Sequence, residues 1–307
     1  MLRKYFMFSF TSLTALLWLT IASLAATPLV DTDWIKANAE KDGIVFLDVR
    51  SRKAYRQGHV PYAVHTSYKR DQWRMKKGNI KGLLPPTDYL EKLIGRLGID
   101  NSTHVVIMHG GYSAAETAVA TRIYWTFKVL GHDNVSILNG GMRAWLSEKS
   151  NPLEKTDNTP KRKVFKADMN TEILASASDV RAALGTNVTL LDSRPADQFS
   201  GKSKSGSVVR YGTLPGAISV PGLLMINNDT KEFISASGLE QLYASRNAPT
   251  TGETIVFCNT GQWASLGWFI DYELLGNNQS KLYDASLAEW SLLPNSEAPM
   301  IVSKKAN

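Results

Sequence analysis

The chain has 307 residues, a formal net charge of +7 at pH 7 and a single cysteine, Cys258. This length exceeds that of a typical single domain, which predicts two domains. A lone cysteine excludes a disulfide within the chain and a zinc knuckle, and the histidines lack ligand spacing, so we expect neither metal nor cofactor. The basic excess is spread along the chain, which suits small anionic substrates and gives no indication of nucleic-acid binding.

Residues 1–26 have the pattern of an export signal. Arg3 and Lys4 form a basic start, residues 6–24 form an uncharged apolar run, and small residues near Ala25 suit cleavage. We therefore expect an exported, periplasmic protein with no stable membrane insertion after cleavage. The alternative is an uncleaved N-terminal anchor, because the apolar run is nearly long enough to span a bilayer.

An internal repeat divides the rest of the chain into two similar halves. Three segments of the first half recur in the same order in the second: 44–50 as 188–194, 105–111 as 255–261, and 141–145 as 286–290. This alignment pairs Cys258 with Met108. Because methionine cannot form a thiolate, a nucleophile is expected in the second half alone.

Each half alternates short apolar strands with helical segments, which predicts an α/β fold with a mainly parallel sheet flanked by helices. In the first half we expect strands near 44–48, 104–108 and 135–138, and helices near 87–97 and 113–129. In the second half we expect strands near 188–191, 253–257 and 281–283, and helices near 176–184, 237–246 and 263–275. Residues 151–170 lack an apolar period and predict a surface linker, which places the domains at 27–150 and 171–307.

Cys258 follows an apolar strand and precedes a polar, glycine-bearing turn that leads into a helix. Ligands bind at the carboxyl ends of strands in open parallel sheets, and the backbone N–H groups of such a turn favour a thiolate and a bound anion. The alternative is a small buried thiol at the end of a core strand. Export favours the reactive interpretation, because an unused thiol is a liability in an oxidising compartment.

Several segments, in one order, carry a family resemblance: 47–50 with 58–61, 131–146, 191–194, 214–218 and the loop that begins at Cys258. Together they make the chain resemble the two-domain rhodanese family of sulfurtransferases. The resemblance implies two tandem rhodanese-like domains, of which the second is catalytic. It also implies that Cys258 takes sulfur from thiosulfate or 3-mercaptopyruvate as a persulfide and passes it to cyanide or a thiol. We expect a monomer.

The resemblance also assigns roles to residues near Cys258. Arg194 would bind the anionic end of the donor, with a structural pair to a carboxylate such as Asp192 as the alternative. Asp192 itself is expected to support the strand end. The donor site would be lined by the loop residues Asn259, Thr260, Gly261, Gln262 and Trp263.

This loop departs from the family's usual patterns. It lacks the basic residues of thiosulfate-type members and the Gly-Ser-Gly-Val-Thr sequence of mercaptopyruvate-type members, although Thr260 offers a hydroxyl. Gly261 suits the positive φ of a tight loop around an anion. Trp263 either narrows the pocket or packs as a core aromatic.

Two other functions use similar sequences. A non-enzymatic rhodanese-like module that carries sulfur or binds a partner is the main alternative, and a thiol buried beneath Trp263 would support it. Phosphatase or arsenate reductase chemistry is disfavoured, because Ala264 stands six positions after Cys258, where those enzymes place an arginine.

Overall fold

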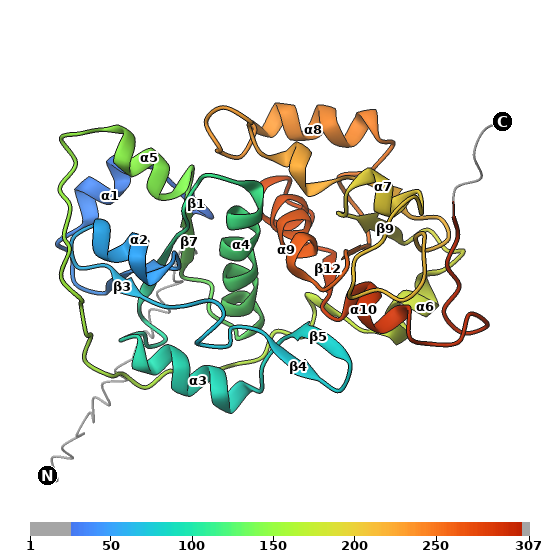
Figure 1. The fold of residues 1–307 in the computed structure, drawn as a ribbon, viewed down its shortest axis with the longest axis horizontal. Coiled ribbons are helices and arrows are strands. Elements are labelled where there is room, and N and C mark those ends of the chain that lie inside the picture. Colours follow the sequence, from blue (N-terminus) through green and yellow to red (C-terminus); the bar gives the residue numbers. More distant parts are fainter. Residues whose placement is uncertain (1–25, 303–307) are drawn as a thin grey trace, which may run out of the picture.

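The computed structural model of the protein describes residues 26–302 and shows two similar halves side by side (Figure 1). The first half contains, in chain order, β1 (Leu29–Val30), α1 (Thr32–Asn38), β2 (Ile44–Asp48), α2 (Arg52–Gln57), β3 (Val64–His65), β4 (Met75–Lys77), β5 (Ile80–Leu83), α3 (Thr87–Arg96), β6 (His104–Met108), α4 (Ala114–Val129), β7 (Val135–Leu138) and α5 (Gly141–Ser147). The second half contains β8 (Leu174–Ala175), α6 (Ala177–Ala183), β9 (Thr189–Asp192), α7 (Ala196–Phe199), β10 (Ile218–Ser219), a 3₁₀ helix (Gly222–Met225), α8 (Ala236–Ser245), β11 (Thr254–Phe257), α9 (Gln262–Trp268), its π-helical continuation (Phe269–Leu274), β12 (Ser280–Tyr283) and α10 (Ser286–Trp290).

Each half is built on a five-stranded sheet in which every strand pair is parallel. The strand orders are β1-β7-β6-β2-β3 and β10-β9-β11-β12-β8, which are the same order when the repeat is taken into account. The predicted α/β fold with two parallel sheets flanked by helices is therefore confirmed. The expected strands and the long helices lie within a few residues of their predicted places.

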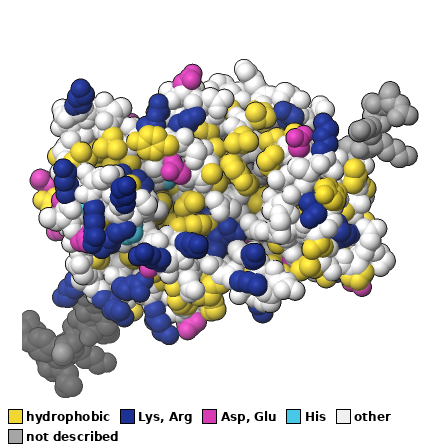
Figure 2. Space-filling model, viewed as in Figure 1, with side chains coloured by type: hydrophobic (Ala, Val, Ile, Leu, Met, Phe, Trp, Pro, Cys, Tyr) yellow, Lys and Arg dark blue, Asp and Glu magenta, His cyan; other side chains and the backbone are white. Residues whose placement is uncertain are grey.

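The first half also carries an antiparallel hairpin that the sequence patterns did not predict. Strands β4 and β5 pair with each other and belong to neither large sheet. The hairpin extends from the first half toward α10 and the second half (Figure 1). Lys and Arg side chains gather over this part of the surface (Figure 2).

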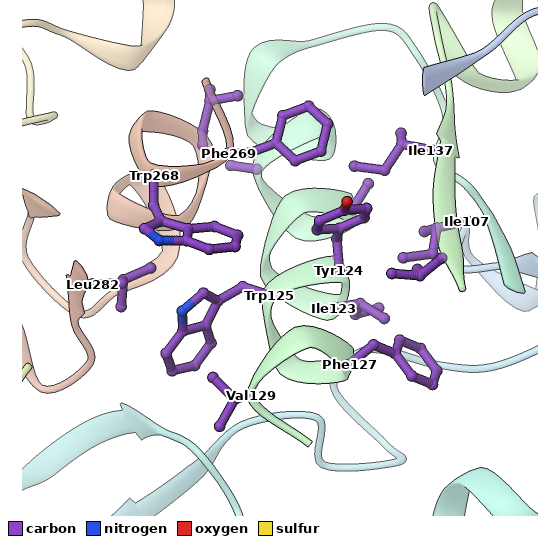
Figure 3. Packing of buried hydrophobic residues seen from close by; sticks show 14 of the residues in the cluster. Ile107, Ile123, Tyr124, Trp125, Phe127, Val129, Ile137, Trp268, Phe269 and Leu282 are labelled. Atoms are coloured by element: carbon purple, nitrogen blue, oxygen red, sulfur yellow. The ribbon is translucent and has the colours of Figure 1, made fainter. Parts of the chain in front are cut away.

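One of the three buried hydrophobic clusters of the described residues spans the two halves, and we call it the shared core. A continuous cluster of buried residues runs from Leu47 in β2 to Val256 in β11. At its centre α4 packs on α9 and its continuation, where the rings of Tyr124 and Phe269 meet edge to face with centroids 4.8 Å apart (Figure 3). Because this interface is apolar and buried, it fixes the position of the first half relative to the loop after β11.

The predicted linker, residues 151–170, wraps along the first half (Figure 1). Glu154 pairs with His59 in an isolated antiparallel bridge, and Phe165 is buried in the shared core. The linker is thus partly packed, rather than running only along the surface as the sequence analysis expected.

The predicted export signal lies outside the described residues, apart from Ala26. Between residues 26 and 302, no helix combines the length and apolar character needed to cross a membrane. The same part of the chain contains no group of three or more His, Cys, Asp or Glu side chains that could hold a metal ion.

Candidate active site

The backbone of Cys258 is fixed at the end of the central strand β11. Its N–H donates to Ser286 Oγ at 3.1 Å, and its carbonyl oxygen accepts from the N–H of Leu287 at 3.1 Å. Ser286 adopts φ 49°, a positive value that few non-glycine residues take. The start of α10 therefore anchors Cys258, whose residue surface is only 1% exposed.

The structure corrects the alignment of the two halves at this point. Met108 lies opposite Asp48 in the first sheet, whereas Phe257 lies opposite Asp192 in the second. His109, not Met108, is therefore the equivalent of Cys258. The backbone hydrogen bonds agree with this alignment. The carbonyl oxygen of His109 accepts from the N–H of Met142 at 2.7 Å, just as the carbonyl oxygen of Cys258 accepts from the N–H of Leu287 at the start of α10. The loop of the second half has one more residue before its positive-φ glycine, which shifted the alignment by one position.

The two equivalent loops differ in what their backbone N–H groups contact. In the first half, the N–H of Tyr112 donates to Glu116 Oε2 at 2.8 Å and that of Gly111 donates to His109 Nδ1 at 3.1 Å. In the second half, the N–H groups of residues 259–264 have no acceptor among the described part of the chain. A side-chain carboxylate and an imidazole thus occupy the first loop, whereas the second leaves a row of donors free beside Cys258.

Two side chains of the second loop contact neighbouring elements of the second half. Asn259 Nδ2 donates to Gln198 Oε1 at 2.8 Å, which ties the loop to α7. The ring of Trp263 packs on Gly222, where a Cβ atom would lie 2.8 Å from the ring. Trp263 therefore packs against the 3₁₀ helix and the buried cluster that the two halves share.

The first half supplies two arginines to this loop. Arg74, just before β4, donates from Nη1 to Gln262 Oε1 at 2.9 Å and from Nη2 to the carbonyl oxygen of Thr260. Arg122, in α4, is fully buried, forms an ion pair with Asp284 and donates to the carbonyl oxygen of Gly261 at 3.3 Å. The loop that lacks a cation of its own is thus held by two cations from the other half.

Sequence reasoning missed both arginines. The position of Arg122 directly before the apolar run 123–125, in the middle of the predicted helix 113–129, was a signal, because an arginine on an apolar helix face requires a partner. No comparable signal existed for Arg74, since the contact joins residues 186 or more positions apart.

Arg194 does not lie where the donor-binding expectation placed it. Its side chain is fully buried, donates from Nη2 and Nε to the Asp192 carboxylate at 2.6 and 2.9 Å, and donates to the carbonyl oxygen of Gly212 at 2.9 Å. Arg50 makes the same pair with Asp48 in the half without a cysteine. This repeated pair favours the structural alternative for Arg194, because of its guanidinium nitrogens only Nη1 is left without a hydrogen-bond partner among the described residues. Asp192 lies as expected, at the strand end.

Comparison with known proteins identifies the family of the chain. The rhodanese-like domain family matches it twice, over residues 31–148 and 176–293. The chain belongs to this family. A protein of Saccharopolyspora erythraea, assigned by its name to the thiosulfate sulfurtransferases, is 35% identical over 278 residues, which cover 86% of this chain and 93% of the relative. The thiosulfate sulfurtransferase of Gallus gallus is 28% identical over 241 residues, with 78% and 81% of the two chains covered.

A solved structure agrees with this placement. SseA from Escherichia coli, a 3-mercaptopyruvate sulfotransferase, matches the fold with a TM-score of 0.71 at 23% identity, over 85% of this chain and 99% of its own. The predicted resemblance is confirmed, and the rhodanese-like chain is an enzyme of the sulfurtransferase class.

Gly261 provides a test of how tightly the loop of this rhodanese-like chain is built. It adopts φ +78°, and a Cβ atom there would lie 2.5 Å from both Arg122 Nη1 and the carbonyl oxygen of Asp284. We expect Gly261→Ala to destabilise the fold by about 1–3 kcal/mol beyond the cost of the positive φ, through overpacking. We also expect it to lower sulfur transfer by about 10²-fold, because displaced reacting groups lose alignment.

Gly276→Ala is the matched control for this variant. Gly276 has almost the same φ, +76°, but nothing lies within 4 Å of its added Cβ. It should show only the backbone cost of about 1–2 kcal/mol, with normal activity in the folded fraction. Denaturant unfolding and transfer assays on both variants measure the difference, and equal losses would show that the loop is not tightly packed.

Proposed function

We propose that the chain moves sulfane sulfur through a persulfide on Cys258. The thiolate attacks the outer sulfur of the donor and forms a new S–S bond. With thiosulfate, the bond between the two donor sulfurs breaks and its electron pair leaves with sulfite. Cyanide or a thiolate acceptor then takes the outer sulfur, and the thiolate of Cys258 is regenerated.

The free backbone donors of residues 259–264 carry this proposal. A thiolate, a persulfide and a bound oxyanion all concentrate negative charge, and preorganised N–H groups stabilise such charge without rearrangement. The equivalent donors of the first loop that contact Glu116 and His109 are already used. This difference supports the second loop as the place of the reaction, with a supporting role for the first half.

Thiosulfate and 3-mercaptopyruvate are the proposed donors. The names of the relatives from Saccharopolyspora erythraea and Gallus gallus support thiosulfate. The hydroxyl of Thr260 and the absence of a basic residue at positions 259–263 support 3-mercaptopyruvate. With that donor the C–S bond breaks, and its electron pair forms an enolate that is protonated to pyruvate.

A second candidate function is that of a rhodanese-like module that carries sulfur or binds a partner, with Cys258 unreactive. The 1% exposure of Cys258 favours it, because an unreactive thiol needs no access. Labelling of the native protein with a small alkylating reagent separates the two functions. A thiol that reacts in seconds supports sulfur transfer, and one that reacts only on unfolding supports the module.

Intact-protein mass spectrometry tests the proposed reaction. The protein without residues 1–26 is incubated briefly with thiosulfate or with 3-mercaptopyruvate, and then with cyanide. We expect a gain of one sulfur atom on Cys258 that cyanide removes. No gain with either donor would contradict the proposal.

We also propose that the protein is exported to the periplasm and acts as a monomer. The basic start and apolar run of residues 1–26 support export. N-terminal sequencing of protein from the periplasmic fraction should give a start near residue 27, and an intact N-terminus in the membrane fraction would show an anchor instead. Sedimentation analysis should give the mass of one chain.

A further inference from the structure

The β4–β5 hairpin and Thr260, in the loop after Cys258, line an open pocket on the surface. We call it the hairpin pocket; its volume is about 460 Å³, and Thr260 contributes to its wall. Its basic lining residues are Lys69, Arg74, Lys76 and Lys81. A pocket of roughly 300–1,000 Å³ suits an organic small molecule, whereas a small inorganic anion fills only part of it.

The charges of this pocket are not neutralised by the protein. Lys76 lies directly opposite Lys81 in the antiparallel register. Like charges in that position destabilise a strand pair. Among the described residues, none of the four basic side chains of the pocket forms an ion pair with a carboxylate. The hairpin thus bears a repulsion that a bound anion would relieve.

A second observation also points to a ligand. Tyr68 contributes to the wall of the pocket, and its buried hydroxyl lies beside the Arg74 guanidinium without a hydrogen bond of good geometry to any described residue. Burial of this phenol raises its pKa, so the hydroxyl keeps its proton and is a donor at neutral pH. Buried polar groups are rarely left unpaired without a reason.

Arg74 connects this pocket to the catalytic loop. Besides its contacts with Thr260 and Gln262, its Nε donates to the carbonyl oxygen of Gly82 in β5 at 2.8 Å. A single guanidinium therefore joins the hairpin to the loop that follows Cys258. Anything bound at the hairpin lies beside the reactive loop.

We propose that the hairpin pocket binds the carboxylate end of an organic sulfur donor, with Lys76 and Lys81 as specificity-determining residues and Arg74 as a positioning residue. This inference rests on the proposed function of the Cys258 loop. The first half then supplies the positive charge that the loop lacks. In an organic donor such as 3-mercaptopyruvate two carbon atoms separate the carboxylate from the sulfur, so the charge can lie at the hairpin while the sulfur lies at the loop. In thiosulfate, by contrast, the oxyanion is bonded directly to the outer sulfur.

The test is a binding measurement that does not depend on turnover. Calorimetric titration of Cys258→Ser protein with 3-mercaptopyruvate, and separately with thiosulfate, gives the two dissociation constants. Adding Lys76→Glu or Lys81→Glu should weaken 3-mercaptopyruvate binding tenfold or more and change thiosulfate binding by less than threefold. Lys77→Glu, on the same strand but not in the wall of the pocket, changes the net charge equally and should leave both constants unchanged.

A stability measurement provides a second readout. Lys76→Glu creates an opposite-charge pair with Lys81. It should therefore raise the midpoint of thermal unfolding slightly while it weakens the binding of 3-mercaptopyruvate. In the otherwise native protein, the same variant should raise the KM for 3-mercaptopyruvate with little change in kcat.

The outcomes separate this inference from the proposed function. If binding depends on Lys76 but the native protein forms no persulfide, the hairpin pocket remains a binding site and the proposed reaction on Cys258 is wrong. If the persulfide forms but the dissociation constant of 3-mercaptopyruvate is unchanged in both Lys76→Glu and Lys81→Glu, the hairpin pocket is not the donor site. If the variants weaken the binding of thiosulfate as much as that of 3-mercaptopyruvate, the proposed preference for an organic donor is wrong. If neither donor binds measurably, the whole inference is wrong.

Discussion

Cys258→Ser is expected to lower sulfur transfer by about 10³-fold or more, because loss of a catalytic nucleophile removes the covalent route. A serine hydroxyl has almost the same shape but is a far weaker nucleophile toward sulfur at neutral pH. The substitution should change the free energy of unfolding by less than about 1.5 kcal/mol, as a near-isosteric replacement does. Steady-state transfer from both donors, together with denaturant unfolding, measures the two effects.

His109→Asn is the matched control, because His109 occupies the equivalent position in the first half. Burial lowers the pKa of His109 to about 4, so its imidazole is neutral at pH 7. Its substitution should leave transfer by the folded protein within about threefold of normal, because the replacement of a buried side chain outside the reacting loop acts mainly on stability. Retained turnover in Cys258→Ser, or an equal loss in His109→Asn, would move the reaction away from Cys258.

The sequence was sufficient for the fold because the signals were local and repeated. The apolar strands and the long helices each follow from a period within one segment, and the repeat supplied the two-domain arrangement. It was not sufficient for the alignment of His109 with Cys258, because one extra loop residue before Gly261 is invisible without strand register.

The candidate site was predictable only in part. Cys258 and its loop could be found from the strand and turn that hold them. Arg74 and Arg122 could not be placed there, because they reach the loop from the other half of the chain through tertiary packing. Arg194 was assigned a ligand role by resemblance, whereas burial and the Asp192 carboxylate decide its contacts.

Arg194→Ala is therefore expected to destabilise the protein rather than to weaken donor binding selectively. Both side chains of the Arg194–Asp192 pair are fully buried, and after the arginine side chain is removed only Thr213 Oγ1 and the backbone N–H of residue 194 would still donate to the carboxylate. Breaking a buried pair by removing one partner costs about 3–5 kcal/mol, because the other charge is left uncompensated. Chemical denaturation followed by circular dichroism measures the loss.

Arg50→Ala provides the comparison that separates structure from donor binding. Arg50 pairs with Asp48 at the same 2.6 Å, but 8% of its side chain is exposed and no cysteine follows the neighbouring strand. If Arg194 is structural, both variants should lose stability to a similar degree, and the folded fraction of each should keep its KM for thiosulfate and 3-mercaptopyruvate. A raised KM in Arg194→Ala alone, with unfolding unchanged, would return Arg194 to the donor site. The repeated arginine–carboxylate pair in a half without a nucleophile favours the first result, because a donor ligand would have no use there.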